Sequence, residues 1–216
     1  MTKTRIVTLA PGEPFPAGEI ARGLLAGAVA AYPTETFYAL GAAAFNAGGV
    51  ARVFRLKKRD ASKPLSFIVS DLDMVREVVA PDPPGAFKVL AGEFWPGPLT
   101  LVLPAAAGLP DRLLGPGRTI ALRLPPLAWL RDLVREMSEP LTATSANLAG
   151  EPEIADPRRI ADLFGGRVDL VIDGGPAPGG RPSTIVDLAG EAPRLLREGP
   201  ISAARIEAVL GARVLT

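Results

Sequence analysis

The chain has 216 residues, 48% of them hydrophobic and 22% charged, and its formal net charge is +1. These values predict one sizeable core in a single domain, residues 1–216, and argue against a polyanion-binding surface over the whole protein. Because the chain has no Cys and no His, disulfides, thiolate or imidazole metal sites and histidine-dependent catalytic triads are excluded. Any chemistry must use Lys and Arg charge, hydroxyls, amides, carboxylates or a metal ion held by oxygens.

The sequence carries no membrane or export signal. No apolar run approaches the roughly 20 residues of a membrane-spanning helix, and the first residues, MTKTRIVTL, lack the apolar core of a signal peptide. We therefore expect a cytoplasmic protein with no membrane partner.

Hydrophobic periodicity predicts helices and strands that alternate along the chain. Residues 18–30 indicate a helix leading into a short strand that ends at Tyr32, and residues 48–58 indicate a second helix. Further strands are predicted at residues 64–71, 99–104, 119–125, 141–146, 168–175 and 183–188. Further helices are predicted at residues 71–80, 84–93, 126–137, 157–164 and 202–210. Asp156 has the form of a helix start and Gly211 of a helix end. This alternation predicts an α/β fold with a mixed sheet.

Two segments in the first third of the chain carry polar groups that a plain core does not need. YPTET, residues 32–36, puts hydroxyls and a carboxylate at what looks like a strand-to-helix junction, although Thr34 could simply cap the next helix. Residues 52–64 hold six basic residues and one acid. Lys57 and Arg59 fall at a predicted helix C-terminus, where cations are favoured and can turn toward an anion. The alternative is a solvated helix face.

Two later segments have the same character. In TATSANLAG, residues 142–150, hydroxyls and an amide follow an apolar strand and suit phosphate or ribose oxygens, although a helix cap or Asx turn would use the same residues. GGRPSTIVDL, residues 179–188, is glycine-rich but lacks the Gly-Lys-Ser/Thr of a P-loop and precedes a strand. A nucleotide bound here is therefore bound in another way.

Seven segments occur in the order and rough spacing of one known family: YPTETFYALG, LKKRDASKPLSF, FWPGPLTLVL, TIALRLP, TSANLAGEP, STIVDL and LLREGPI. Over about residues 15–205 the chain resembles the Sua5/YrdC/YciO/YwlC family, the threonylcarbamoyl-AMP synthases. The resemblance implies a twisted sheet flanked by helices, with a large concave basic cavity (YrdC-like), in the short form without the extra C-terminal domain of longer members.

The resemblance also implies an activity and its partners. L-Threonine, bicarbonate and ATP, with Mg²⁺, would be converted to L-threonylcarbamoyl-AMP and pyrophosphate, which makes the chain a nucleotidyltransferase. A separate threonylcarbamoyl transferase complex would then use the product to modify tRNA. Such electrostatic chemistry needs no imidazole.

Motif position assigns the family's functional residues to this chain. The catalytic, nucleotide-facing signature is the K-x-R and S-x-N pairs: Lys57, Arg59, Ser145 and Asn147. The ATP side is Arg59, Lys63, Thr119, Ser145, Asn147 and Arg197. The L-threonine side is Thr36, Arg123 and Ser183. Metal ligands stay unassigned.

One departure keeps other functions open. Most synthases read YGLG where this chain reads YALG, with Ala39 in place of the glycine. This variant is more similar to the YciO branch, whereas the K-x-R and S-x-N pairs favour the synthase branch. The alternatives are a YciO-like paralogue that uses the nucleotide pocket for another acyl-adenylate or a regulatory role, and an RNA-binding module, or weak RNA binding, in the same cavity. An aromatic content of 6% weighs against RNA binding.

Overall fold

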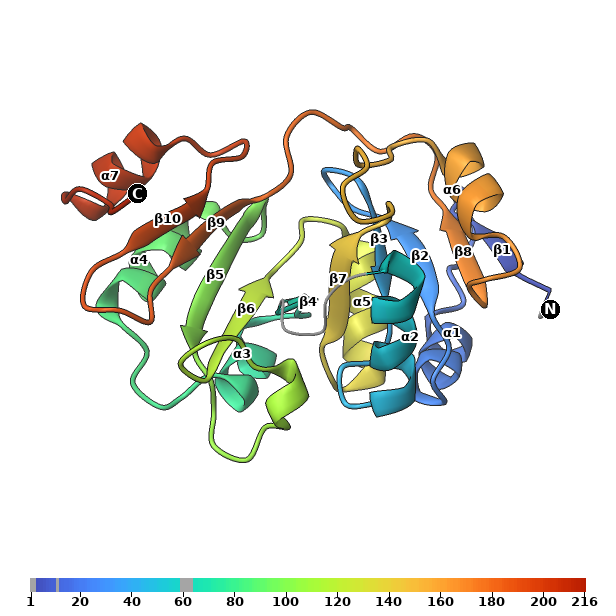
Figure 1. Ribbon diagram of the computed structural model, residues 1–216, viewed down its shortest axis with the longest axis horizontal. Helices are drawn as coiled ribbons and strands as arrows, with labels where there is room; N and C mark the ends of the chain where they lie inside the picture. The colour runs from blue at the N-terminus through green and yellow to red at the C-terminus, as the bar shows by residue number, and fades with distance from the viewer. Residues whose placement is uncertain (1–2, 11, 59–63) are drawn as a thin grey trace.

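The computed structural model describes residues 3–10, 12–58 and 64–216. Within them, strands form one 10-stranded mixed sheet in the order β1-β8-β2-β3-β7-β4-β6-β5-β9-β10 (Figure 1). The strands are β1 (Arg5–Thr8), β2 (Ala30–Pro33), β3 (Tyr38–Gly41), β4 (Ser66–Ile68), β5 (Leu99–Pro104), β6 (Thr119–Arg123), β7 (Leu141–Ser145), β8 (Leu170–Asp173), β9 (Thr184–Asp187) and β10 (Arg194–Arg197). The helices are α1 (Ala17–Leu25), α2 (Ala47–Lys57), α3 (Leu72–Val78), α4 (Gly85–Phe94), α5 (Ala128–Met137), α6 (Pro157–Phe164) and α7 (Ala203–Leu210), with a 3-10 turn η1 (Asp111–Leu113).

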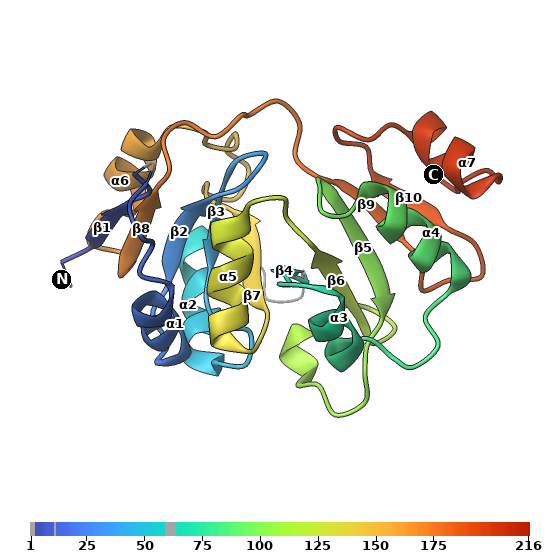
Figure 2. The ribbon, with the colours of Figure 1, turned by 180° about the vertical axis from the view of Figure 1, so that it is seen from behind.

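Helices cover the two faces of the sheet unequally. On one face, α2 and α6 lie over β8, β2 and β3 (Figure 1) and bury Val53, Ile160 and Phe164 in a small core. On the other face, α1 packs against α5 and α4 against α7 over the larger core (Figure 2). The strands β4, β6, β5 and β9 therefore have helices behind them, and their front face is left for the site.

The predicted fold class is confirmed, and most predicted elements lie within a few residues of the observed ones. Asp156 is the N-cap of α6, where its carboxylate accepts from the N–H of Arg158 at 2.9 Å. Gly211 ends α7 at a φ of 65°, a left-handed conformation that glycine adopts without strain. Both caps were predicted from the sequence.

The prediction that YPTET joins a strand to a helix is wrong. β2 pairs antiparallel with β3, so residues 34–37 form the turn of a hairpin, and Thr34 caps no helix. β3 has the sequence YALG, whose small residues gave no strand signal. β1 and β10 were also missed because they are the two edge strands and most of their side chains are exposed, which removes the apolar alternation that predicts a strand.

Candidate active site

The open face of the sheet lines a cavity of about 400 Å³, a size typical of small-molecule sites. Side chains two residues apart on a strand point the same way, so each strand contributes a pair to this face. The pairs are Thr100 and Val102 of β5, Ala121 and Arg123 of β6, and Ala143 and Ser145 of β7. The small alanine side chains of β6 and β7 leave room for the cavity. The polar residues paired with them on these strands, Arg123 and Ser145, face into it.

The turn of the β2–β3 hairpin closes one end of the cavity. Thr34 Oγ1 accepts from the N–H groups of Thr36 and Phe37, at 3.2 and 3.3 Å, and donates to the carbonyl oxygen of Phe37 at 2.7 Å. Because its single proton is used there, the Thr36 hydroxyl, 3.1 Å away, must be the donor between the two hydroxyls. Thr36 therefore keeps lone pairs that can accept a hydrogen bond from a ligand.

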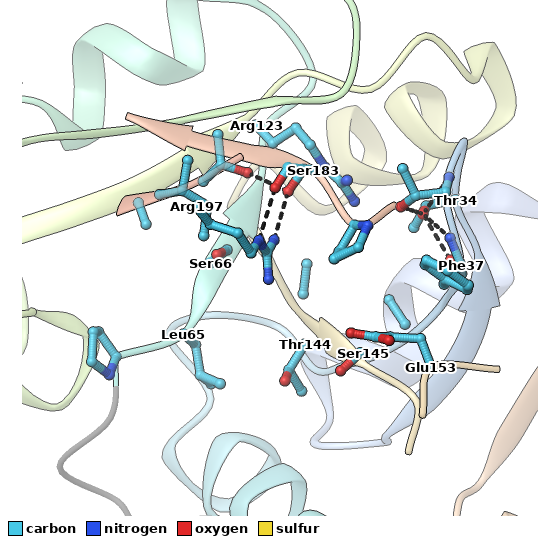
Figure 3. A pocket seen from close by; sticks show the side chains of 18 of the residues that line it. Thr34, Phe37, Leu65, Ser66, Arg123, Thr144, Ser145, Glu153, Ser183 and Arg197 are labelled. Atoms are coloured by element: carbon cyan, nitrogen blue, oxygen red, sulfur yellow. Dashed lines mark hydrogen bonds between the residues drawn. The ribbon is translucent and has the colours of Figure 1, made fainter. Parts of the chain in front are cut away.

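Ser183 and Arg197, assigned to different substrates by motif, are in direct contact (Figure 3). Arg197 donates to the carbonyl oxygen of Ser183 at 2.9 Å and to its hydroxyl at 3.1 Å, and that hydroxyl is 2.9 Å from the hydroxyl of Thr100. Burial lowers the pKa of Arg197, nearby Glu153 raises it, and Arg123 lowers it further. The two predicted subsites thus share a wall.

Arg123 is a nearly buried cation whose side chain is 8% exposed. Its guanidinium pairs with Glu35 at 3.3 Å and donates no hydrogen bond to any residue that the structure describes. Figure 3 shows the guanidinium pointing into the cavity between Ser183 and Thr34. An arginine fork with donors to spare suits a carboxylate.

Lys57, the last residue of α2, lies behind the cavity wall and is 3% exposed. Its ammonium donates to the backbone oxygens of Ser145 and Asn147, to Ser145 Oγ at 3.3 Å and to Asn147 Oδ1 at 2.7 Å. Asn147 Oδ1 also accepts from Ser145 Oγ at 2.6 Å, and its amide nitrogen donates to the carbonyl oxygen of Glu151. In this arrangement Ser145 lines the cavity, while Lys57 and Asn147 hold Ser145 in place.

The remaining predicted residues are placed less directly. Thr119 begins β6 outside the cavity lining, and its hydroxyl donates to the carbonyl oxygen of Pro116 at 3.0 Å. Arg59 and Lys63 lie outside the described residues, so their assignments stay predictions. The structure thus brings together Thr36, Arg123, Ser183, Ser145 and Arg197 around one cavity.

The cavity also has polar residues that were not predicted as site residues, among them Thr100 and Glu153. Thr100 is fully buried and interrupts an otherwise apolar strand at an inward position, which was a usable signal. Glu153 points its carboxylate into the cavity (Figure 3) and makes no hydrogen bond or ion pair within the described part of the chain. Its only signal was its place in the polar stretch after TSANLAG.

Residues 3–10, 12–58 and 64–216 offer neither a cluster of metal ligands nor a membrane-spanning helix. These residues contain no group of three or more His, Cys, Asp or Glu side chains arranged to hold a metal ion. None of their helices is long and apolar enough to cross a bilayer.

The fold and cavity define an α/β protein with a polar small-molecule site on the open face of its sheet. The model of the Sua5/YciO/YrdC family, described as "Telomere recombination", matches residues 22–199. The chain belongs to this family, as its motifs predicted.

Curated relatives agree with this placement. A threonylcarbamoyl-AMP synthase of Pyrococcus abyssi is 38% identical over 185 residues, which is 86% of this chain and 54% of that protein. One of Bacillus subtilis is 39% identical, over 85% of this chain and 53% of that protein. The chain therefore spans about half the length of these two relatives. One of Coxiella burnetii is 39% identical over 172 residues, which is 78% of this chain and 91% of that protein.

Two solved structures share the fold. P. abyssi Sua5 complexed with L-threonine superposes with a TM-score of 0.91 at 34% identity, covering 99% of this chain and 63% of that one. Escherichia coli YciO superposes with a TM-score of 0.84 at 28% identity, covering 94% of this chain and 99% of that one.

Proposed function

We propose that this protein is an L-threonylcarbamoyladenylate synthase, a nucleotidyltransferase. The amine nitrogen of L-threonine bonds to the carbon of bicarbonate with loss of water, which gives a carbamate. A carbamate oxygen then bonds to the α-phosphorus of ATP, and pyrophosphate leaves with the electrons of the broken P–O bond. The names of the relatives and the threonine complex of P. abyssi Sua5 support this proposal.

The observation that carries the proposal is the position of Arg123. Its spare guanidinium donors face the same cavity as the hydroxyls of Thr36 and Ser183. This set matches an amino acid that has both a carboxylate and a side-chain hydroxyl. We assign the carboxylate to Arg123 and the hydroxyl to Thr36, which has accepting capacity left.

Ser145 and Arg197 would hold the nucleotide on the adjoining wall. Arg197 can neutralise charge that develops on the phosphates, and Ser145 Oγ can orient a phosphate or ribose oxygen. We keep Arg59 and Lys63 as proposed ATP residues on motif position alone. We propose that Mg²⁺ enters with ATP as the counter-ion of its phosphates.

The product is a reactive mixed anhydride, so it needs a consumer. We propose that a threonylcarbamoyl transferase complex takes it and modifies tRNA. Because ATP and tRNA are present in the cytoplasm, we also place the reaction there.

Ala39 keeps a second candidate function in view. It lies in the cavity wall opposite Ser145 in the β3–β7 pairing and is 5% exposed, so its methyl group takes space that a glycine would leave. A YciO-like paralogue that activates another acyl group would use the same cavity, and so would an RNA-binding module.

The test is pyrophosphate release by the purified chain with Mg²⁺, ATP, bicarbonate and one amino acid at a time. We expect threonine to be used best. Serine loses a methyl contact, worth about 1 kcal/mol, and valine leaves a buried hydroxyl without its partner, at a cost of about 1–3 kcal/mol. Thr36→Val should lower the rate of threonine-dependent pyrophosphate release clearly and should change the melting temperature little.

Three outcomes would contradict the proposal. Release that is independent of bicarbonate would exclude carbamate formation. Equal use of valine and threonine would remove the assignment of Thr36 and favour the paralogue. Charge contacts in an open cavity are screened by salt, so a general attraction between tRNA and the cavity would be lost at high salt. Tight binding of tRNA that persists in added salt and without ATP would therefore favour the RNA-binding module.

A further inference from the structure

Glu35, in the turn between β2 and β3, has a buried carboxylate that accepts no hydrogen bond from the described part of the chain. Its side chain is 11% exposed. Its two oxygens are the only buried side-chain nitrogen or oxygen atoms in the described residues that lack a hydrogen-bond partner. Burying an ionised carboxylate in this way is costly unless a nearby charge compensates for it.

The compensating charge is Arg123, whose Nη1 is 3.3 Å from Glu35 Oε1. Among the described residues, each is the only ion-pair partner of the other. Because both side chains are shielded from solvent, the pair interacts far more strongly than an exposed one. Glu35 therefore fixes one edge of the guanidinium, and the guanidinium points into the cavity (Figure 3).

The charge of Glu35 also matters for the cavity as a whole. Arg123 and Arg197 line the same cavity and are close enough for Arg123 to lower the pKa of Arg197. Two uncompensated arginines in one cavity would attract a di- or triphosphate as one site. With Glu35 beside it, Arg123 belongs to a close ion pair, whereas Arg197 feels only the more distant charge of Glu153 and makes no ion pair within the described residues.

We propose that Glu35 is a specificity-determining residue that reserves Arg123 for a singly charged carboxylate and excludes polyphosphates from the amino-acid subsite. This inference rests on the proposed function, in which Arg123 binds the carboxylate of threonine. Glu35 acts through Arg123: it positions the guanidinium and cancels part of its field. The cavity is thereby divided into an amino-acid side and a phosphate side.

The experiment is a calorimetric titration of threonine into the protein, with and without inorganic pyrophosphate. For the wild type, pyrophosphate should leave the Kd of threonine unchanged. Glu35→Gln keeps the size of the side chain and removes its charge. For this variant, pyrophosphate at about ten times its own Kd should raise the apparent Kd of threonine roughly tenfold, as expected for competition at one site.

Two further variants separate charge from folding. Glu19→Gln removes an exposed carboxylate that pairs with Arg5 far from the cavity, and it should behave as the wild type. Glu35→Asp keeps the charge, so threonine binding should stay resistant to pyrophosphate. Glu35→Asp also supplies the answer if Glu35→Gln does not fold, since competition in the aspartate variant overturns the proposal.

The inference and the proposed function fail in different ways. A wild type that binds no threonine contradicts the proposed function. A wild type that binds threonine, together with a Glu35→Gln variant in which pyrophosphate does not compete, overturns the role of Glu35 alone. Competition that is equal in both proteins overturns it as well.

Discussion

Lys57 has a role in the structure that differs from the nucleotide contact implied by its motif. Its ammonium supplies hydrogen bonds to Ser145 and Asn147 and is nearly fully buried. Lys57→Met keeps the length of the side chain and removes the donor to the carbonyl oxygen of Asn147, while Asn147 Oδ1 keeps only its hydrogen bond from Ser145 Oγ. This loss should cost about 1–3 kcal/mol of unfolding free energy. The measurement is urea denaturation followed by circular dichroism.

The same variant should also release less pyrophosphate under conditions where it is fully folded, because Ser145 is no longer held at the cavity wall. The matched control is Lys58→Met, which removes an exposed cation one residue further on and should change neither quantity. If Lys57→Met lowered activity without lowering stability, Lys57 would be a direct ligand contact.

At the scale of single residues, the sequence predicted membership of the site better than it predicted roles. Thr36, Arg123, Ser183, Ser145 and Arg197 were all named in advance and all line the cavity. Hydrogen-bond partners are set by which atoms meet in space, so the sequence could not show that Arg197 donates to Ser183. The burial of Glu35 was hidden for the same reason.

Among the elements, the β2–β3 hairpin was the main error of the sequence prediction. Gly41, the last residue of β3, allows this hairpin to pack closely against β7. A Cβ built on Gly41 would lie 2.2 Å from the carbonyl oxygen of Thr142 on β7 and 2.8 Å from Cε1 of Tyr32. Gly41→Ala should therefore force β3 away from β7 and destabilise the protein by about 1–3 kcal/mol, the usual cost of overpacking. Chemical denaturation measures this difference.

Gly23 provides a control of opposite sign. It is exposed in α1, and apart from its chain neighbours and the backbone of its own helix no described atom lies within 4 Å of an added Cβ. Gly23→Ala should stabilise the protein by about 0.5–1 kcal/mol, because alanine favours a helix more than glycine does. Loss of stability in both variants would show that the close approach of β3 and β7 is not the cause.

For the whole molecule, composition and periodicity were enough for the fold class but not for the topology. The interior strands β5, β6, β7, β8 and β9 were each predicted because their apolar runs are buried. Their order in the sheet depends on long-range pairing, such as β4 between β6 and β7, which no local pattern records. The cavity was predicted by the family resemblance alone, because no local pattern records where strands distant in the sequence meet.

Alkaline unfolding should report on the whole fold, because both tyrosines of the chain, Tyr32 and Tyr38, are fully buried. Burial raises the pKa of Tyr38 to about 12 and raises that of Tyr32 as well. The unfolded chain loses these protons near pH 10, so their contribution to stability is complete below that pH. It is lost as the pH rises toward 12, by up to about 1.4 kcal/mol per pH unit for each tyrosine.

Urea denaturation at a series of pH values should give a level free energy of unfolding up to about pH 10 and a fall above it, and Tyr38→Phe should have a shallower fall. Phenolate absorbance should appear only as the protein unfolds, and its appearance in the native protein near pH 10 would contradict the burial of both rings.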